Sequence, residues 1–412
     1  MPRTPADLLV LNAGALVTLA GPRRPRAGKE LSDLAILEGG AVAARGGKIL
    51  AVGPTAELRR QYAAKVTIDA RGALVTPGLV DPHTHLVFMG TREAEFEMRT
   101  AGRPYLEIAG KGGGIHATVE RVRAATKAEL VRAARPRLRL MLEHGTTTVE
   151  AKSGYGLTPE DEVKSLEAIR ELGCVPTFLG AHEVPPGRPR ADYVREVVEV
   201  MVPRAAALAR FCDVFCEVGV FSVDDARAIL EAARRAGMGL KLHAEEFRAS
   251  GGAELAAELG AASADHLGAV TDRGIRALHR AGTVAVLLPG TTCFLGLERY
   301  APARRMIEEG VAVALGTDFN PGSCTALSLP LIMTLACSQM KMSPAEAWTA
   351  TTVNAAYAIG EGDRAGSLEP GKRADLVVWD AKDYREVPYS FGVNLARQVV
   401  KGGAACAGRP AP

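Results

Sequence analysis

The sequence lacks the features that mark several classes of protein. Its seven cysteines contain no Cys-x-x-Cys pair and their number is odd, which favours reduced thiols over a disulfide framework or a zinc knuckle. No run of about 18 apolar residues occurs, so no membrane-spanning helix is expected. The 50 basic residues nearly balance the 47 acidic ones, with a formal net charge of +3. So small a bias predicts binding to neither nucleic acid nor a membrane surface.

One apolar segment, residues 8–20, has the length of the core of a signal peptide. Asp7 precedes it, Asn12 interrupts it, and an arginine-rich stretch follows at 23–26. A first strand and turn explain this pattern better than a cleaved leader does. Together with the reduced cysteines, this predicts a cytoplasmic protein.

The middle of the chain alternates strand-like runs with amphipathic helical stretches, such as 159–172, 193–209 and 223–236. The expected strands are residues 79–85, 146–150, 175–180, 212–217, 239–243, 263–266, 283–288 and 311–316. Eight such units predict an α/β fold, a (β/α)₈ TIM-type barrel over residues 79–365. The alternative, a doubly wound sheet, needs a glycine-rich fingerprint after its first strand, and Gly112–Gly114 lies too far downstream.

Both ends of the chain have the pattern of β structure. Short apolar runs broken by Gly, Pro and Asn fill the first 78 residues, and residues 376–379 and 398–400 continue the pattern. Neither end has enough strands for a stable core of its own. We therefore predict that residues 1–78 and 366–412 form one small composite β-sandwich beside the barrel.

Histidines gather at the ends of the predicted strands, where the active sites of barrels lie. His83 and His85 are two residues apart on the first strand, so their side chains point the same way. His243 ends the fifth strand and Asp318 follows the eighth. Three histidines and one carboxylate suit a single zinc or iron ion with room for water. A lone histidine is more often an ordinary core residue and Asp318 has an alternative as a helix N-cap, but their shared position favours metal ligands.

Three further residues are predicted to surround this site. His266 ends the sixth strand and is assigned to stabilising an oxyanion, because a mononuclear site cannot use every histidine as a ligand. His182, after the third strand, is assigned to the substrate. Glu246 lies three residues beyond His243 and is the predicted proton shuttle, with Asp318 as a second participant. The alternative for Glu246 is an exposed acid that begins the next helix.

This pattern of strand-end histidines and aspartate resembles the amidohydrolase superfamily, and the sequence is more closely similar to the imidazolonepropionase family. The segments Lys-Ser-Gly-Tyr-Gly (152–156) and Asp-Phe-Asn-Pro-Gly (318–322) are more specific to that family than His-x-His. The stretches that carry the resemblance span the whole predicted barrel: 77–86, 149–156, 211–217, 241–247, 289–292 and 317–323.

The resemblance implies a metal-binding hydrolase of histidine metabolism that opens the cyclic amide of 4-imidazolone-5-propanoate to give N-formimino-L-glutamate. It implies one Zn²⁺ or Fe²⁺/Fe³⁺ ion per subunit, a homodimer, and no role for Lys152 as a ligand. The implied metal ligands are His83, His85, His243 and Asp318, and the implied substrate contacts are Arg92, Tyr155, His182, Glu246, Asn320, Gly322 and Ser323.

The chemistry of these residue types suits a substrate that carries a propionate. The guanidinium of Arg92 can hold a carboxylate with two parallel hydrogen bonds. Tyr155 and Asn320 can donate further bonds, and the backbone N–H groups of the turn 320–323 are expected to face the substrate. The first rival hypothesis, a deaminase or hydrolase of another heterocycle, does not account for these acid-binding residues. The second, a non-catalytic scaffold, predicts lost ligand residues, whereas all four are present.

Overall fold

The computed structural model describes residues 3–102 and 114–408, and eight parallel strands form its centre. They pair in chain order, and a parallel bridge between Thr84 and Phe319 joins the segments that follow the first and last of them, which closes the ring. The (β/α)₈ barrel predicted from the sequence is therefore confirmed. The strands are β8 (Leu79–Asp81), β9 (Thr146–Lys152), β10 (Val175–Ala181), β11 (Phe211–Cys216), β12 (Gly239–Ala244), β13 (Ser263–His266), β14 (Val284–Leu287) and β15 (Val313–Leu315).

The first strand is shorter than predicted, because β8 ends at Asp81 and not at His85. Pro82 follows and has no N–H to donate to a neighbouring strand. The backbone N–H groups beyond it bond elsewhere: that of His83 donates to the Asp81 carboxylate, and that of His85 to the carbonyl of Phe319. Regular strand pairing therefore stops at Asp81, although the bridge between Thr84 and Phe319 keeps the histidine segment beside its neighbour.

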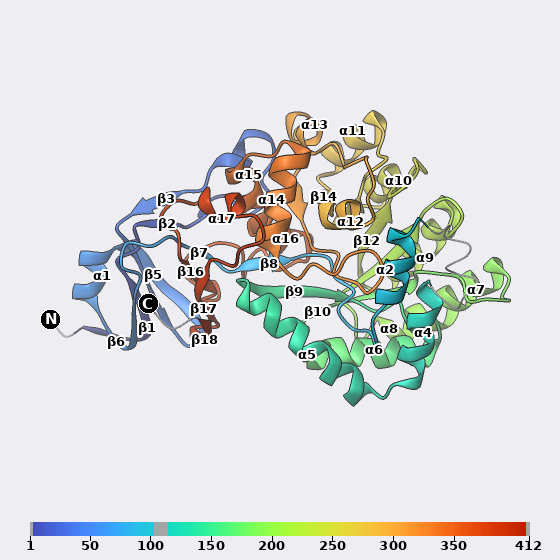
Figure 1. The fold of residues 1–412 in the computed structure, drawn as a ribbon, viewed down its shortest axis with the longest axis horizontal. Helices are drawn as coiled ribbons and strands as arrows, with labels where there is room; N and C mark the ends of the chain where they lie inside the picture. The colour runs from blue at the N-terminus through green and yellow to red at the C-terminus, as the bar shows by residue number, and fades with distance from the viewer. Residues whose placement is uncertain (1–2, 103–113, 409–412) are drawn as a thin grey trace.

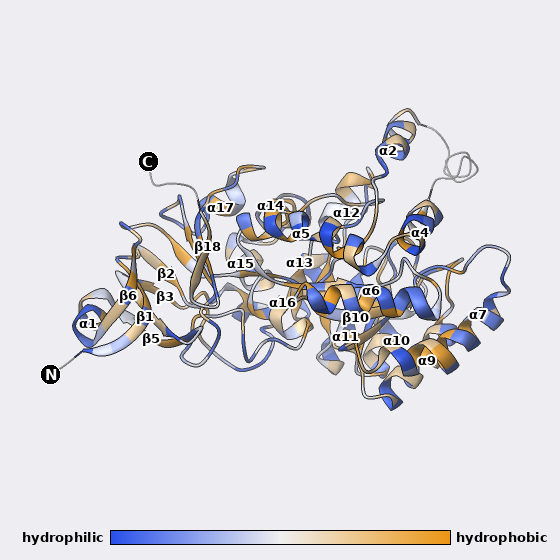
Figure 2. Ribbon diagram, turned by 90° about the horizontal axis from the view of Figure 1, so that it is seen from below, coloured by the Kyte–Doolittle hydropathy of each residue, from blue (hydrophilic) through white to orange (hydrophobic). Residues whose placement is uncertain are grey.

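Helices cover the outside of the barrel, and α6 and α9 show blue and orange faces typical of amphipathic helices (Figure 2). Ser222 caps α9 in a capping box with Asp225. No helix within residues 3–102 and 114–408 is long and apolar enough to cross a membrane. The helices that surround the barrel are α4 (Ile115–Ala124), α5 (Lys127–Glu143), α6 (Pro159–Glu171), α7 (Arg190–Glu196), α8 (Val202–Ala205), α9 (Val223–Arg235), α10 (Gly252–Glu258), α11 (Asp272–Ala281), α12 (Pro289–Phe294), α13 (Ala303–Glu308), α14 (Leu329–Met340), α15 (Pro344–Ala350) and α16 (Val353–Ala358).

The single helix predicted over 193–209 is wrong in detail. The structure has α7, then a π-helical turn at Val197–Met201, then the short α8. Pro203 has no N–H for the carbonyl of Glu199, four residues earlier, so regular α-helical bonding cannot continue through this point. The wider turn is one way in which a helix absorbs such an interruption.

The two ends of the chain form a pair of sheets on one side of the barrel, drawn in blue and red in Figure 1. Their shared apolar core includes Leu8, Val42 and Val75 from the first part of the chain and Leu376 and Val400 from the last. The composite sandwich is confirmed, and we propose domain boundaries at 1–78 plus 366–412 and at 79–365. The strands are β1 (Thr4–Leu11), β4 (Gly40–Arg45), β5 (Lys48–Pro54) and β6 (Tyr62–Asp69) in one sheet, and β2 (Ala15–Val17), β3 (Ile36–Glu38), β7 (Val75–Pro77), β16 (Leu376–Trp379), β17 (Ala396–Lys401) and β18 (Ala404–Gly408) in the other.

Candidate metal centre and active site

Five buried side chains meet at the carboxyl ends of the barrel strands. His83 and His85 follow β8, His243 lies in β12, His266 ends β13, and Asp318 follows β15. Two of them have left-handed backbone conformations, with φ of 74° at His266 and 51° at Asp318. Such conformations are uncommon for residues with side chains and gather at functional sites, where the surrounding structure enforces them.

Three short distances link the donor atoms of the four predicted ligands. Asp318 Oδ1 lies 3.4 Å from His83 Nε2 and 3.5 Å from His85 Nε2. The Nε2 atoms of His85 and His243 are 3.4 Å apart. Ligand atoms about 2.0–2.1 Å from a tetrahedral zinc ion are separated by about 3.3 Å from one another. The donor spacing therefore fits a single small ion of this kind.

The protonation of these groups also fits a metal. Burial, followed by neighbouring cationic groups, holds the pKa values of His83 and His85 well below their ordinary value, so both imidazoles are neutral. Neutral imidazole is the form that binds metals. His83 Nε2 is buried without a hydrogen-bond partner among the described residues. An ion at this point would satisfy a nitrogen that the other described residues leave without a hydrogen bond.

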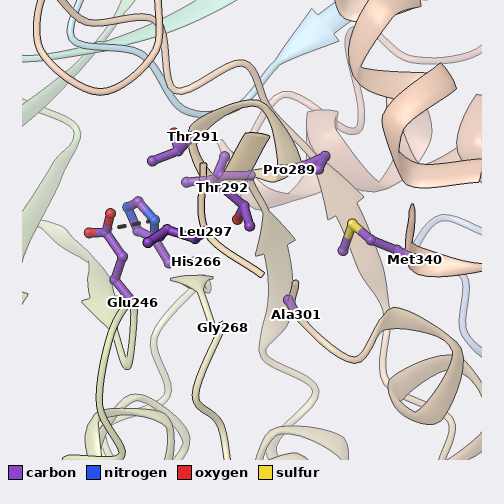
Figure 3. Close-up of a pocket in the computed structure, with 10 residues that line it drawn as sticks. Glu246, His266, Gly268, Pro289, Thr291, Thr292, Leu297, Ala301 and Met340 are labelled. Atoms are coloured by element: carbon purple, nitrogen blue, oxygen red, sulfur yellow. Dashed lines mark ion pairs between the residues drawn. The ribbon is translucent and has the colours of Figure 1, made fainter. Parts of the chain in front are cut away.

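His266 lies close enough to form a second, overlapping donor group with His83 and His243. Its Nδ1 faces Glu246 Oε2 at 3.7 Å, and Figure 3 shows the two side chains turned toward each other. Burial, and then the charges of Asp318 and Glu217, raise the pKa of Glu246 well above its ordinary value. The pair therefore lies beside the candidate metal ligands with an acid poised to hold a proton.

Two carboxylates behind the histidines orient them. His83 Nδ1–H donates to Asp265 Oδ2 at 2.6 Å, which leaves Nε2 pointing at the metal centre. His243 Nδ1 lies 3.0 Å from Asp213 Oδ1. A carboxylate behind a metal-binding histidine fixes its tautomer and ring orientation. Neither aspartate was among the predicted site residues.

Lys152 lies beneath these carboxylates inside the barrel. Its Nζ is 2.8 Å from Glu150 Oε1, 2.8 Å from Asp213 Oδ2 and 3.8 Å from Asp265 Oδ2. Although burial alone lowers the pKa of Lys152, the three carboxylates raise it overall. The ammonium group is thus an internal counter-ion to these carboxylates. A sequence signal for this cluster exists, since charged residues interrupt the apolar runs of β9, β11 and β13.

A cavity of about 560 Å³ opens beside the metal centre. His85, His243, His266 and Asp318 lie at its floor, so the catalytic and substrate-binding predictions fall on one site. All seven residues predicted to contact substrate line the same cavity: Arg92, Tyr155, His182, Glu246, Asn320, Gly322 and Ser323.

The orientation of His182 is fixed from behind. Its Nδ1–H donates to the carbonyl of Gly154 at 3.0 Å, and its ring stacks on His85 with centroids 4.9 Å apart. Burial lowers the pKa of His182 to about 3, so the ring is neutral and its Nε2 is left as a hydrogen-bond acceptor. Tyr155 lies next to it, with ring centroids 5.3 Å apart, and burial raises the pKa of its phenol.

The turn at 320–323 differs from expectation. The N–H groups of Gly322 and Ser323 donate to Asn320 Oδ1 at 2.8 and 2.7 Å, so they do not face the cavity. The Asn320 amide in turn donates to the Asp318 carbonyl and to Ser323 Oγ. Asn320 is thereby used to build the turn, because a side-chain amide can bond the backbone of its own turn. The turn positions Asp318.

Comparisons with known proteins extend this description. The model of the amidohydrolase family matches residues 74–404, and that of a bacterial imidazolonepropionase-like composite domain matches residues 40–64. The chain is 51% identical to an imidazolonepropionase from Geobacillus thermodenitrificans over 96% of this chain and 97% of that protein. It is 52% identical to one from Symbiobacterium thermophilum, with 97% of each covered.

Solved structures share the fold at lower sequence identity. An adenosine deaminase from Xanthomonas campestris with bound zinc superposes with a TM-score of 0.75 at 22% identity, covering 98% of this chain and 93% of that one. A 5-methylcytosine deaminase from Klebsiella pneumoniae gives a TM-score of 0.75 at 17% identity, with 98% and 99% covered. Such distant likeness shows the fold alone, whereas the sequence matches over nearly the full length are decisive: the chain belongs to the imidazolonepropionases of the amidohydrolase family.

Proposed function

We propose that this hydrolase opens the cyclic amide of 4-imidazolone-5-propanoate to give N-formimino-L-glutamate, a step of histidine degradation. One observation carries the proposal: the cavity that every predicted substrate contact lines is also lined by His85, His243 and Asp318, three of the four predicted metal ligands. The names of the relatives that match nearly the whole chain support the same reaction.

We assign one zinc or iron ion to His83, His85, His243 and Asp318. When bound, the ion supplies Lewis acidity and makes water acidic enough to act as a nucleophile near neutral pH. The protein supplies the orientation, because Asp265 fixes the ring of His83 from behind. The donor set of nitrogen and carboxylate oxygen does not by itself choose between zinc and iron.

Glu246 moves the proton in this proposal. It accepts a proton from the attacking water and passes it to the ring nitrogen as the C–N bond breaks. The oxygen of one water molecule thus enters the new carboxyl group, and the proton goes to the released formimino nitrogen. Burial raises the pKa of Glu246, which makes the carboxylate a stronger base and allows the acid to persist until the nitrogen leaves. Asp318 is its neighbour and shares in the transfer.

His266 stabilises the oxygen of the carbonyl under attack. Its Nε2 is buried with no hydrogen-bond partner among the described residues, and it lines the same cavity. A donor aimed at the developing negative charge is worth most where water is excluded. At the other end of the substrate, we assign the propionate to Arg92, with Tyr155 and His182 holding the ring.

Direct turnover tests this function. Protein loaded with zinc or with iron is incubated with 4-imidazolone-5-propanoate, and N-formimino-L-glutamate is quantified with and without a chelator. The expected result is product formation that a chelator abolishes and added metal restores. Purines, pyrimidines and hydantoins are assayed beside it; turnover of one of these without turnover of the imidazolone would show that the substrate has been misassigned.

Two further proposals concern the cell and the assembly. All seven cysteines are free, which supports a cytoplasmic location. Membership of the imidazolonepropionases supports a homodimer, and sedimentation equilibrium of the purified protein tests it against a monomer.

A further inference from the structure

The side chain assigned to the substrate carboxylate already has a carboxylate partner. Arg92 precedes α2 (Glu93–Thr100), and its Nε and Nη2 donate to the two oxygens of Glu95 at 2.8 and 2.6 Å. Both side chains are only 15% exposed, so this pair is largely shielded from water. Its net charge is zero. Arg92 alone therefore brings no uncompensated positive charge to the cavity.

A second arginine lies on the same helix face. Arg99 is seven residues after Arg92 and four after Glu95, a spacing of two helical turns and one turn. It lines the cavity together with Arg92 and Glu95. Figures 1 and 2 show α2 beside α12, and the ring of Phe96 stacks on that of Phe294 in α12 at 5.2 Å. This contact holds the helix that presents both arginines.

Among the described residues, the guanidinium of Arg99 has a hydrogen bond and a ring contact but no carboxylate partner. Its Nη1 donates to the carbonyl of Gly322 at 3.1 Å, and its Cζ lies 5.0 Å from the ring centre of Phe294. Its Nη2 is buried and has no hydrogen-bond partner in the part of the chain that the structure describes. Within that part Arg99 also forms no ion pair. A buried N–H group of this kind is expected to have a hydrogen-bond acceptor. Because Arg99 lines the cavity, a ligand bound there can supply that acceptor.

The side chains of Arg92, Glu95 and Arg99 together carry a net charge of one positive unit, which one anion would balance. Arg92 and Arg99 carry two positive charges and Glu95 one negative charge. Burial, followed by the proximity of Arg92, lowers the pKa of Arg99, while Glu95 raises it. Gly322 connects the two arginines, since Arg99 bonds its carbonyl and a Cβ at this position would lie 2.3 Å from Arg92 Nη1. A single carboxylate complements this arrangement in charge.

We propose that Arg99 is a second carboxylate-binding residue, whose Nη2 receives the substrate's propionate beside Arg92 and which sets the preference for an acidic over a neutral side chain on the heterocycle. In this arrangement Glu95 orients Arg92 and cancels its charge, while Arg99 supplies the net charge. The inference rests on the proposed function for the identity of the substrate. The preference for a carboxylate rests on the arginine cluster.

The test compares Arg99→Met and Arg99→Lys with wild-type protein and with Arg139→Met. Arg139 is exposed on α5, and Glu143 is its one ion-pair partner among the described residues. The metal-loaded proteins are titrated by calorimetry with 3-(imidazol-4-yl)propanoate and with its uncharged amide. For Arg99→Met we expect about 10- to 100-fold weaker binding of the propanoate, the usual effect of losing a hydrogen bond between charged groups. Binding of the amide should change by less than threefold. Arg99→Lys should recover part of the loss, because it keeps the charge but not the planar fork.

Turnover separates this inference from the function on which it rests. With 4-imidazolone-5-propanoate as substrate, Arg99→Met should raise KM by a similar factor with kcat within about threefold, as for a contact made equally in ground and transition states. Wild-type protein that fails to turn over this substrate would refute the proposed function, while the comparison of propanoate with amide would still judge Arg99. Equal loss for the two ligands, or no loss for either, would overturn the role of Arg99.

Discussion

Replacing Lys152 by methionine should destabilise the barrel strongly, although the residue touches neither solvent nor the cavity. The ammonium group lies 2.8 Å from carboxylate oxygens of both Glu150 and Asp213, and all three side chains are fully buried. Methionine has a similar length and volume, so packing is nearly retained while two buried carboxylates lose their shared cation. Removing one partner of a buried ion pair typically costs about 3–5 kcal/mol.

This loss converts to a measurable shift in the thermal midpoint. The entropy of unfolding is about 2 cal/mol/K per residue, summed over 412 residues. Dividing the lost free energy by this entropy gives a fall in Tm of about 4–6 °C. Calorimetry of the metal-free protein measures it. The Tm of the metal-loaded protein should fall less, because a bound dication compensates part of the negative charge that the missing lysine leaves unpaired. The double variant Lys152→Met/Glu150→Gln should recover part of the loss, since one of the unpaired charges is then removed.

An exposed ion pair provides the control. Arg139 and Glu143 are four residues apart on α5, with nitrogen and oxygen 2.9 Å apart and the arginine 81% exposed. Exposed pairs of this kind contribute about 0.3–0.5 kcal/mol, so Arg139→Met should shift Tm by less than 1 °C. If Lys152→Met shifted Tm no more than this control, the claim that the lysine holds buried carboxylates together would be refuted.

Three further predictions concern the site itself. Glu246→Gln should lower kcat by about 10²–10⁴-fold with KM nearly unchanged in steady-state assays, because the amide cannot relay a proton; undiminished turnover would remove Glu246 from this role. Asp265→Asn should weaken zinc affinity by about 10- to 100-fold in competition with a chromophoric chelator, because the ring of His83 exchanges a charged acceptor for a neutral amide; unaltered affinity would show that His83 is held by other contacts. Gly322→Ala should raise KM more than it lowers kcat, since the new methyl group would meet Arg92 Nη1; equal kinetic constants would mean that Arg92 can move without consequence.

The sequence predicted the barrel well because its signal is local. Alternation of apolar runs with amphipathic helices marks each strand by its own residues, and all eight predicted strands occur, with ends displaced by a few residues. The errors fall where a single proline changes the bonding: Pro82 ends β8 early, and Pro203 interrupts the helix predicted over 193–209. In both places the outcome depends on which backbone carbonyl loses its N–H donor. The periodicity of apolar residues does not reveal this.

The candidate metal ligands were also predictable, because strand ends of a parallel barrel meet at one rim whatever the details of packing. The groups behind them were not. Whether Asp213 faces His243 or Asp265 faces His83 depends on how strands are staggered around the barrel, which pattern reading does not give. Arg99 was missed for a similar reason, since its contact with Gly322 joins residues 223 positions apart.

The barrel interior carries an excess of negative charge. Among the described residues, the buried acids Asp81, Glu150, Asp213, Asp265 and Asp318 lie in or just after the barrel strands, together with the buried ammonium groups of Lys152 and Lys241. The histidines at the rim do not compensate, because burial keeps the imidazoles of His83 and His85 neutral. Burial instead raises the pKa of Asp81 to about 7 and that of Asp318 to about 6, so the cluster relieves its charge by holding protons.

A dication among the histidines would relieve the same charge without protons. It would favour the ionised form of Asp318, because a nearby positive charge lowers the pKa of a carboxyl group. Metal binding should therefore release protons from the site, and the metal and Lys152 both favour the ionised form of Asp318. The stability contributed by Lys152 and the metal affinity of the site thus have a common electrostatic origin. A change that alters one is expected to alter the other.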